Sequence, residues 1–320
     1  MDHNLIRIRE RRLLVLAVIC LVLIVIVFRV AVDTSAGQTA GNAAIAGGMA
    51  SQAAILREAE RALNLISLTT LAAATLVIMA IGFIRGGWRL AAAAGGAILG
   101  ANVLSQVLKR YVLQRPALMD VQDPFGSHNS FPSGHATIGM SLVLGLLIVL
   151  PAAGDIWAGL LGWCYLVATG IAMVAEGWHR PSDAVGGYLV ATFAASIASA
   201  AALWLCGRAL RGLPLAVPAS NQHWRASRAL APAALALAAA AAAAMRAVSG
   251  GRGWDALDDT TFGWSFVTGT VYVSAVAAAM IALVLATLAG ADLTIASWRR
   301  DDGGLAGVQD PAARSRRSRS

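Results

Sequence analysis

Apolar residues in this chain occur in unbroken runs of about 20 residues, the length that a helix needs to cross the hydrocarbon core of a bilayer. Eight segments have this character: 13–32, 63–84, 90–108, 136–154, 156–175, 184–207, 229–245 and 264–291. Only 13% of the residues are charged, whereas a typical soluble domain has about a quarter. This pattern excludes a soluble enzyme, a disordered chain and a disulfide scaffold. It predicts an all-α, polytopic membrane helix bundle.

The basic residues indicate how the bundle is oriented. They outnumber acidic residues by 25 to 17, an excess that in a soluble protein points to nucleic acid. Here most of them lie in short connecting segments and at the chain ends, where they orient helices in a bilayer. With the N-terminus inside, inner segments hold about twice as many as outer ones. We therefore expect a multi-pass cell-membrane protein with both termini cytoplasmic, embedded in the lipid bilayer and with no nucleic-acid partner.

The first apolar run allows two interpretations. Basic residues precede it within 7–12, as in the n-region of a cleavable signal peptide. Its length favours a membrane anchor instead.

Three polar clusters stand at predicted membrane boundaries: residues 109–116, 130–135 and 176–183. Under the expected topology all three lie on the outer face. Ionisable residues are expensive in lipid, so their clusters mark candidate functional sites. The clustering at a boundary, and not at mid-membrane, argues against a transporter.

The first two clusters can bind an anion. Ser133 can cap the helix that follows it, and the free N–H groups of a helix N-terminus attract anions. Gly134 allows close approach of the backbone to such an anion. Lys109, the only lysine in the chain, and Arg115 would add positive charge. Lys109 could instead be a residue that extends its amine to the membrane surface.

The histidines can carry catalysis. His135 and His179 can divide the roles of acid–base catalyst and nucleophile. Asp183 lies one helical turn after His179, where a carboxylate can keep one imidazole nitrogen protonated and leave the other free to attack. Either histidine alone would also fit a structural role.

These three clusters resemble the motifs of the type 2 phosphatidic acid phosphatase (PAP2) superfamily. The superfamily has a Lys followed by Arg-Pro, then Pro-Ser-Gly-His, then Ser-Arg with His and Asp downstream. The second motif is intact at 132–135, and His179 and Asp183 match the third. The resemblance spans roughly residues 60–207.

The resemblance implies a lipid phosphatase that hydrolyses a phosphate monoester or pyrophosphate of a membrane lipid at the outer face. It implies that His179, oriented by Asp183, forms a phosphohistidine while His135 acts as acid and then base. Phosphate binding is expected from Lys109, Arg115, Ser133 and Gly134. No metal and no cofactor is expected.

Two departures from the motifs matter. Lys109 and Arg115 enclose five residues, whereas six are usual. The Ser-Arg pair of the third motif is replaced by Ala172 and Met173, so a phosphate-binding arginine is missing. Arg180 or Arg110 could replace it, and we name Arg180 as a further phosphate-binding candidate.

The chain accordingly divides into an anchor helix with an extracytoplasmic loop (1–62), a PAP2-like catalytic core (63–207), two additional transmembrane helices (208–292) and a basic cytoplasmic tail (293–320). With the first span, the core has six helices. Two other functions stay open: a lipid phosphotransferase that uses the same phosphohistidine, and a catalytically inactive scaffold. The sequence defines neither the lipid nor the oligomeric state.

Overall fold

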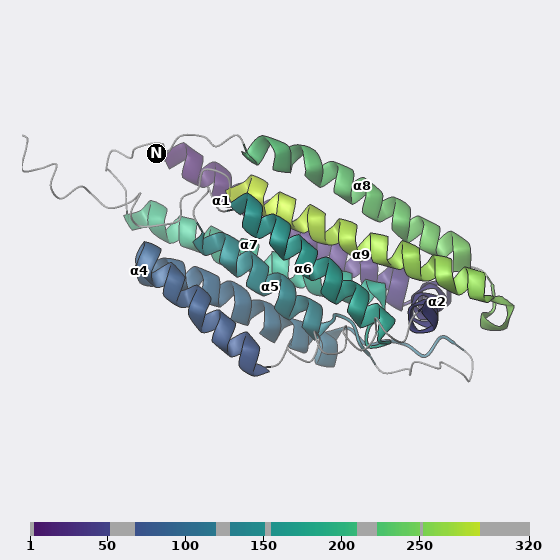
Figure 1. The fold of residues 1–320 in the computed structure, drawn as a ribbon. Coiled ribbons are helices and arrows are strands. Elements are labelled where there is room, and N and C mark those ends of the chain that lie inside the picture. Colours follow the sequence, from purple (N-terminus) through teal and green to yellow (C-terminus); the bar gives the residue numbers. More distant parts are fainter. Residues whose placement is uncertain are drawn as a thin grey trace, which may run out of the picture.

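The computed structural model describes residues 3–51, 68–119, 129–150, 155–209, 223–249 and 252–288. Within these ranges all regular structure is helical, which confirms the predicted all-α bundle (Figure 1). The α-helices are α1 (His3–Val27), α2 (Ser35–Ser51), α4 (Leu68–Val107), α5 (Gly134–Val149), α6 (Asp155–Ala175), α7 (Pro181–Ala209), α8 (His223–Ser249) and α9 (Asp259–Leu288). Short helical turns are η1 (Phe28–Val32), η2 (Leu108–Val112) and η3 (Trp254–Ala256). The expected basic tail lies outside the described residues.

Helix α4 is two antiparallel arms that meet at Gly87. Gly87 has φ 71°, in the left-handed region that glycine adopts without strain, and this allows the chain to reverse. The arms then pack closely, because a Cβ built on Gly95 would lie 2.7 Å from Sδ of Met79. The two arms of α4 therefore correspond to the described parts of the predicted spans 63–84 and 90–108.

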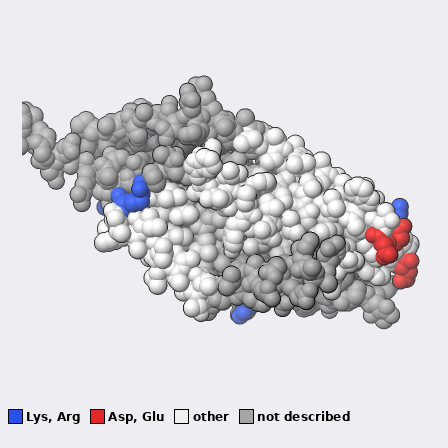
Figure 2. All heavy atoms as spheres, viewed as in Figure 1, with Lys and Arg blue, Asp and Glu red and all other residues white. Residues whose placement is uncertain are grey.

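The lengths and compositions of the described helices indicate a multi-pass membrane protein. Six of them, α4 included, are long and apolar enough to cross a bilayer, and α5 is a shorter apolar helix of 16 residues. Counting both arms of α4, the eight predicted apolar segments correspond to α1, α4, α5, α6, α7, α8 and α9. On the face shown in Figure 2, most of the surface of the described residues is uncharged, and the few charged side chains lie at its periphery.

Helix α2 lies within the segment that was expected to form an extracytoplasmic loop, and the sequence analysis did not predict it. Its sequence is rich in Gly and Ala with polar residues among them, so it has no long apolar run. It is nevertheless buried, because its glycines allow neighbouring backbones to approach. A Cβ on Gly47 would lie 2.0 Å from the carbonyl oxygen of Phe262 on α9. Figure 1 shows α2 nearly end-on, at the end of the bundle where α9 begins.

Helix α5 is enclosed by α4, α6 and α7, and its first residues belong to the second polar cluster. Ser133, which precedes the helix, is fully buried. Helix α7 approaches closely there, since a Cβ on Gly187 would lie 2.7 Å from the carbonyl oxygen of Ser133. This packing brings the start of α7 to the start of α5.

Candidate active site

The third polar cluster forms a tight turn between α6 and α7. Gly177 has φ 72°, which a residue without a Cβ adopts readily, and the chain reverses there. Pro181 then begins α7, in the first-turn position that proline favours. The turn places Nδ1 of His179 3.7 Å from Oδ2 of Asp183, close enough for an ion pair and longer than a hydrogen bond.

Asp183 joins the second and third clusters. Its carboxylate is fully buried, and Oδ2 accepts hydrogen bonds from the hydroxyl of Ser130 (2.6 Å) and the backbone N–H of Arg180 (3.0 Å). Its backbone carbonyl accepts a hydrogen bond from the N–H of Ser133 (2.9 Å). The carboxylate is therefore held rigidly beside the imidazole of His179.

The two predicted histidines lie next to each other. The ring centroids of His135 and His179 are 5.9 Å apart, and the ring of Trp178 lies 5.3 Å from that of His135. Nδ1 of His179 and Oδ1 of Asp183 are buried, and neither has a hydrogen-bond partner among the described residues. A direct hydrogen bond between this imidazole and this carboxylate would require a separation shorter than 3.7 Å.

The start of α5 has the N–H donors that bind anions at helix N-termini. The hydroxyl oxygen of Ser133 caps the helix by accepting a hydrogen bond from the N–H of Ala136 (3.3 Å). The first N–H groups of a helix have no partner within it and carry partial positive charge. Gly134 and His135 supply two of these N–H groups, directly beside the histidine pair.

The first cluster is tied to the second by Asn129. Its Nδ2 donates hydrogen bonds to the carbonyl oxygens of Lys109 (2.8 Å) and Leu113, and its Oδ1 accepts one from the N–H of Phe131 (3.2 Å). Asn129 is followed by Ser130, whose hydroxyl bonds Asp183, so the backbone of Lys109 is tied to the same end of the bundle as the third cluster. All three clusters therefore meet at one end of the bundle.

Helix α2 also contributes to this end. Nε2 of Gln38 donates a hydrogen bond to the carbonyl oxygen of Pro116 (2.7 Å), next to the buried Arg115. Asn42 accepts a hydrogen bond at Oδ1 from Nε of Arg180 (2.7 Å). Nη1 of Arg180 donates a second bond to the hydroxyl oxygen of Ser130 (3.2 Å). Arg180 is thus fixed inside the site, only 2% exposed.

Residues 90–206 match the family model of the PAP2 superfamily. These residues are therefore similar to a PAP2 superfamily domain. The match runs from the second arm of α4 to α7 and includes every predicted site residue. Neither the curated proteins nor the solved structures contain a match to the chain. This match to the family model supports a phosphatase-type function.

Met173 and Arg180 can be compared with the arginine position of the PAP2 motif. Met173 is fully buried and its Sδ lies 3.6 Å from the hydroxyl oxygen of Ser133, so the motif position does face the site. Arg180 reaches the same region from the start of α7 through Ser130. Arg110, the other candidate, is exposed on η2. The geometry therefore favours Arg180 over Arg110.

Three residues around the candidate site were not singled out from the sequence, namely Gln38, Asn42 and Asn129, and Ser130 lay in the second polar cluster without an assigned role. Ser130 and Asn129 adjoin the Pro-Ser-Gly-His motif, and that proximity was a usable signal. Gln38 and Asn42 carried no such signal, because they lie outside the motifs and in a segment without an apolar run. Their role follows from the position of α2.

Among the described residues, no three His, Cys, Asp or Glu side chains gather closely enough to hold a metal ion. The site is instead made of two imidazoles, a carboxylate and several cationic or N–H donors. Such a set can supply a nucleophile, a proton donor and charge compensation for a phosphoryl group.

Proposed function

We propose that the chain is a lipid phosphatase that hydrolyses a phosphate monoester or pyrophosphate of a membrane lipid through a phosphohistidine. The observation that supports this best is the arrangement of His179, with Asp183 beside Nδ1 at 3.7 Å and the ring of His135 at 5.9 Å. It combines an oriented nucleophile with a second proton-transfer group.

In the first step, Nε2 of His179 attacks phosphorus. The N–P bond forms as the bond from phosphorus to the lipid oxygen breaks. Protonated His135 gives its proton to the leaving oxygen, which departs as the lipid alcohol, or as the lipid monophosphate when the substrate is a pyrophosphate. Asp183 accepts the Nδ1 proton in a hydrogen bond and stabilises the positive imidazole.

In the second step, the phosphoryl group passes to water. His135, now neutral, takes a proton from a water molecule whose oxygen attacks phosphorus. The N–P bond breaks and its electrons return to His179. Inorganic phosphate leaves, and both histidines recover their starting protonation states.

Charge compensation lowers the barrier in both steps. Phosphoryl transfer depends mainly on positioning and on donors aimed at the phosphoryl oxygens. Lys109, Arg115 and Arg180 supply fixed positive charge, and the N–H groups at Gly134 and His135 supply the helix N-terminus. In this proposal Arg180 takes the part of the arginine that Met173 replaces.

A membrane lipid is the proposed substrate class because the site lies at one end of a bundle of apolar helices. A lipid remains in the bilayer and presents its phosphate at that boundary. The excess of basic residues in the connections at the other end supports an extracytoplasmic site with both termini in the cytoplasm. The same distribution of basic residues supports the proposal that the chain is inserted in the cell membrane.

The test is release of inorganic phosphate by the purified full-length chain in detergent, with chelator present. The panel would contain phosphatidic acid, phosphatidylglycerol phosphate, and polyprenyl mono- and pyrophosphate. We expect release from at least one lipid, and none from His179→Ala. Activity that survives in His179→Ala would overturn the assignment of the nucleophile.

The phosphohistidine can be examined separately with His135→Ala. A pyrophosphate has a good leaving group and depends least on the proton from His135, whereas water still needs a base. This variant should therefore accumulate an acid-labile phosphoenzyme that His135→Ala/His179→Ala lacks. Added alcohol acceptors test the transferase alternative, because a transferase would form a new phosphate ester in place of inorganic phosphate.

A further inference from the structure

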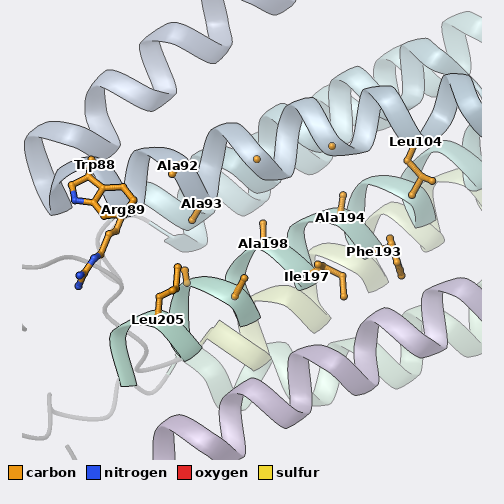
Figure 3. A pocket seen from close by; sticks show the side chains of 14 residues that line it. Trp88, Arg89, Ala92, Ala93, Leu104, Phe193, Ala194, Ile197, Ala198 and Leu205 are labelled. Carbon is orange, nitrogen blue, oxygen red and sulfur yellow. The ribbon is translucent and has the colours of Figure 1, made fainter. Parts of the chain in front are cut away.

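An apolar groove lies between the second arm of α4 and α7, away from the candidate active site. Its volume is about 420 Å³, and Figure 3 shows the two helices that form its walls. Small residues on both helices, among them Gly96, Gly100 and Ala198, leave the space open. In a bilayer such a groove takes up hydrocarbon.

The groove has the length of a lipid chain. Its lining extends along α4 from Arg89 to Leu104, which at the rise of a helix is about 22 Å. One leaflet of the hydrocarbon core is about 15 Å thick, half of a typical bilayer. An extended acyl chain can therefore lie in the groove over its whole length and reach past mid-membrane.

One end of the groove carries a positive charge. Arg89 and Trp88 lie at the end near Leu205, opposite the end formed by Leu104 and Phe193 (Figure 3). Cζ of Arg89 is 5.5 Å from the centroid of the Trp88 ring, a cation–π distance that holds the guanidinium there. Trp88 and Arg89 directly follow Gly87, where the two arms of α4 meet. The candidate catalytic residues lie beyond the opposite end of the second arm, which η2 follows.

We propose that this groove is a binding site for an anionic phospholipid, with one acyl chain between α4 and α7 and the phosphate paired with Arg89. The occupant matches the site in both parts, hydrocarbon along the apolar walls and negative charge at the guanidinium. Guanidinium groups bind phosphate strongly and in bidentate fashion. The site is separate from the catalytic end and holds whether or not the chain is a phosphatase.

The test uses the purified, delipidated full-length chain in detergent. Phosphatidylglycerol or phosphatidylcholine with identical acyl chains is added, and native mass spectrometry counts retained lipid. Arg89→Gln removes the charge. Gly96→Leu fills the groove, because a Cβ on Gly96 meets no atom of the described residues within 4 Å. Arg85→Gln and Gly263→Leu are the matched controls, since neither position lines the groove and Gly263 is equally open.

We expect the wild type, Arg85→Gln and Gly263→Leu to retain one phosphatidylglycerol in preference to phosphatidylcholine. Arg89→Gln should lower retention of phosphatidylglycerol about fivefold, the effect of one cation at an anionic surface, and Gly96→Leu should abolish retention of both lipids. Equal retention of the two lipids by the wild type would overturn the proposal. An Arg89→Gln variant that retains as much phosphatidylglycerol as the wild type would also overturn it. If the wild type is a dimer and Gly96→Leu dissociates it, a second copy of the chain occupies the groove and the proposal is wrong.

Discussion

Nε of Arg180 donates a 2.7 Å hydrogen bond to Oδ1 of Asn42, joining residues 138 positions apart. Asn42 lies on α2, outside the segment that matches the PAP2 family model. The same guanidinium donates to Ser130, which in turn donates to Asp183. A helix outside the matched segment thus orients a cation within the proposed phosphate site.

Replacing Asn42 with alanine should lower kcat/KM. The substitution removes the acceptor that positions a buried guanidinium. A hydrogen bond to a charged group contributes about 1.5–3 kcal/mol. If that energy is lost from the transition state, kcat/KM falls about 10- to 100-fold. Asn102→Ala is the control, because Asn102 bonds the carbonyl of Ile98 and the hydroxyl of Ser141 at a distance from the catalytic residues. Wild-type kinetics in Asn42→Ala would contradict a positioning role.

Arg180→Gln should reduce kcat more strongly than it changes KM. A donor that acts on charge in the transition state contributes about 10²- to 10³-fold. Arg180→Lys should recover only part of the activity, since an ammonium group cannot reproduce the planar donor pattern that bonds Asn42 and Ser130 together. The exposed Arg110→Gln should behave as wild type, and a larger loss in that variant than in Arg180→Gln would reverse the assignment.

Asp183→Asn should almost abolish phosphate release while the protein stays folded. An amide has nearly the shape of a carboxylate, but it can neither hold His179 in the required tautomer nor stabilise its positive form. In a comparable serine–histidine–aspartate site, replacing the aspartate with asparagine lowers kcat about 10⁴-fold. Kinetics and thermal unfolding in detergent would be measured together, with the exposed Asp259→Asn as the control. Full activity with an unchanged melting temperature would refute the orienting role.

Gly187→Ala should destabilise the protein. The new methyl group would lie 2.7 Å from the carbonyl oxygen of Ser133 and 2.8 Å from Cβ of Ala136, so α5 and α7 must separate at the site. Such overpacking costs about 1–3 kcal/mol. Gly100→Ala is the comparison, since its Cβ meets no atom within 4 Å in the described part of the chain, and it should be neutral or slightly stabilising. Equal unfolding temperatures for the two variants would argue against the close contact.

The membrane-spanning helices could be predicted because each depends on a local property. A run of about 20 apolar residues becomes a helix in lipid whatever its neighbours are. The apolar runs do not show how consecutive helices are joined. Gly87, with φ 71°, joins two of these runs into a tight helical hairpin. The predicted spans 63–84 and 90–108 were nonetheless found, because a reversal at Gly87 does not change either run.

The membrane bundle and the three polar clusters could be recognised from the amino-acid sequence alone, and the roles of His135, His179 and Asp183 stay predictions from it. Only the packing of the helices shows that α2 contacts the candidate site through Arg180, whereas Arg110 is exposed. The reason is that α2 gains its stability from close backbone packing, not from an apolar run. Gly41 permits this approach, because a Cβ there would lie 3.2 Å from Cδ of Arg180. Contacts of this kind depend on which helices become neighbours in the fold. Neither the sequence of α2 nor that of the segment around Arg180 predicts this pairing.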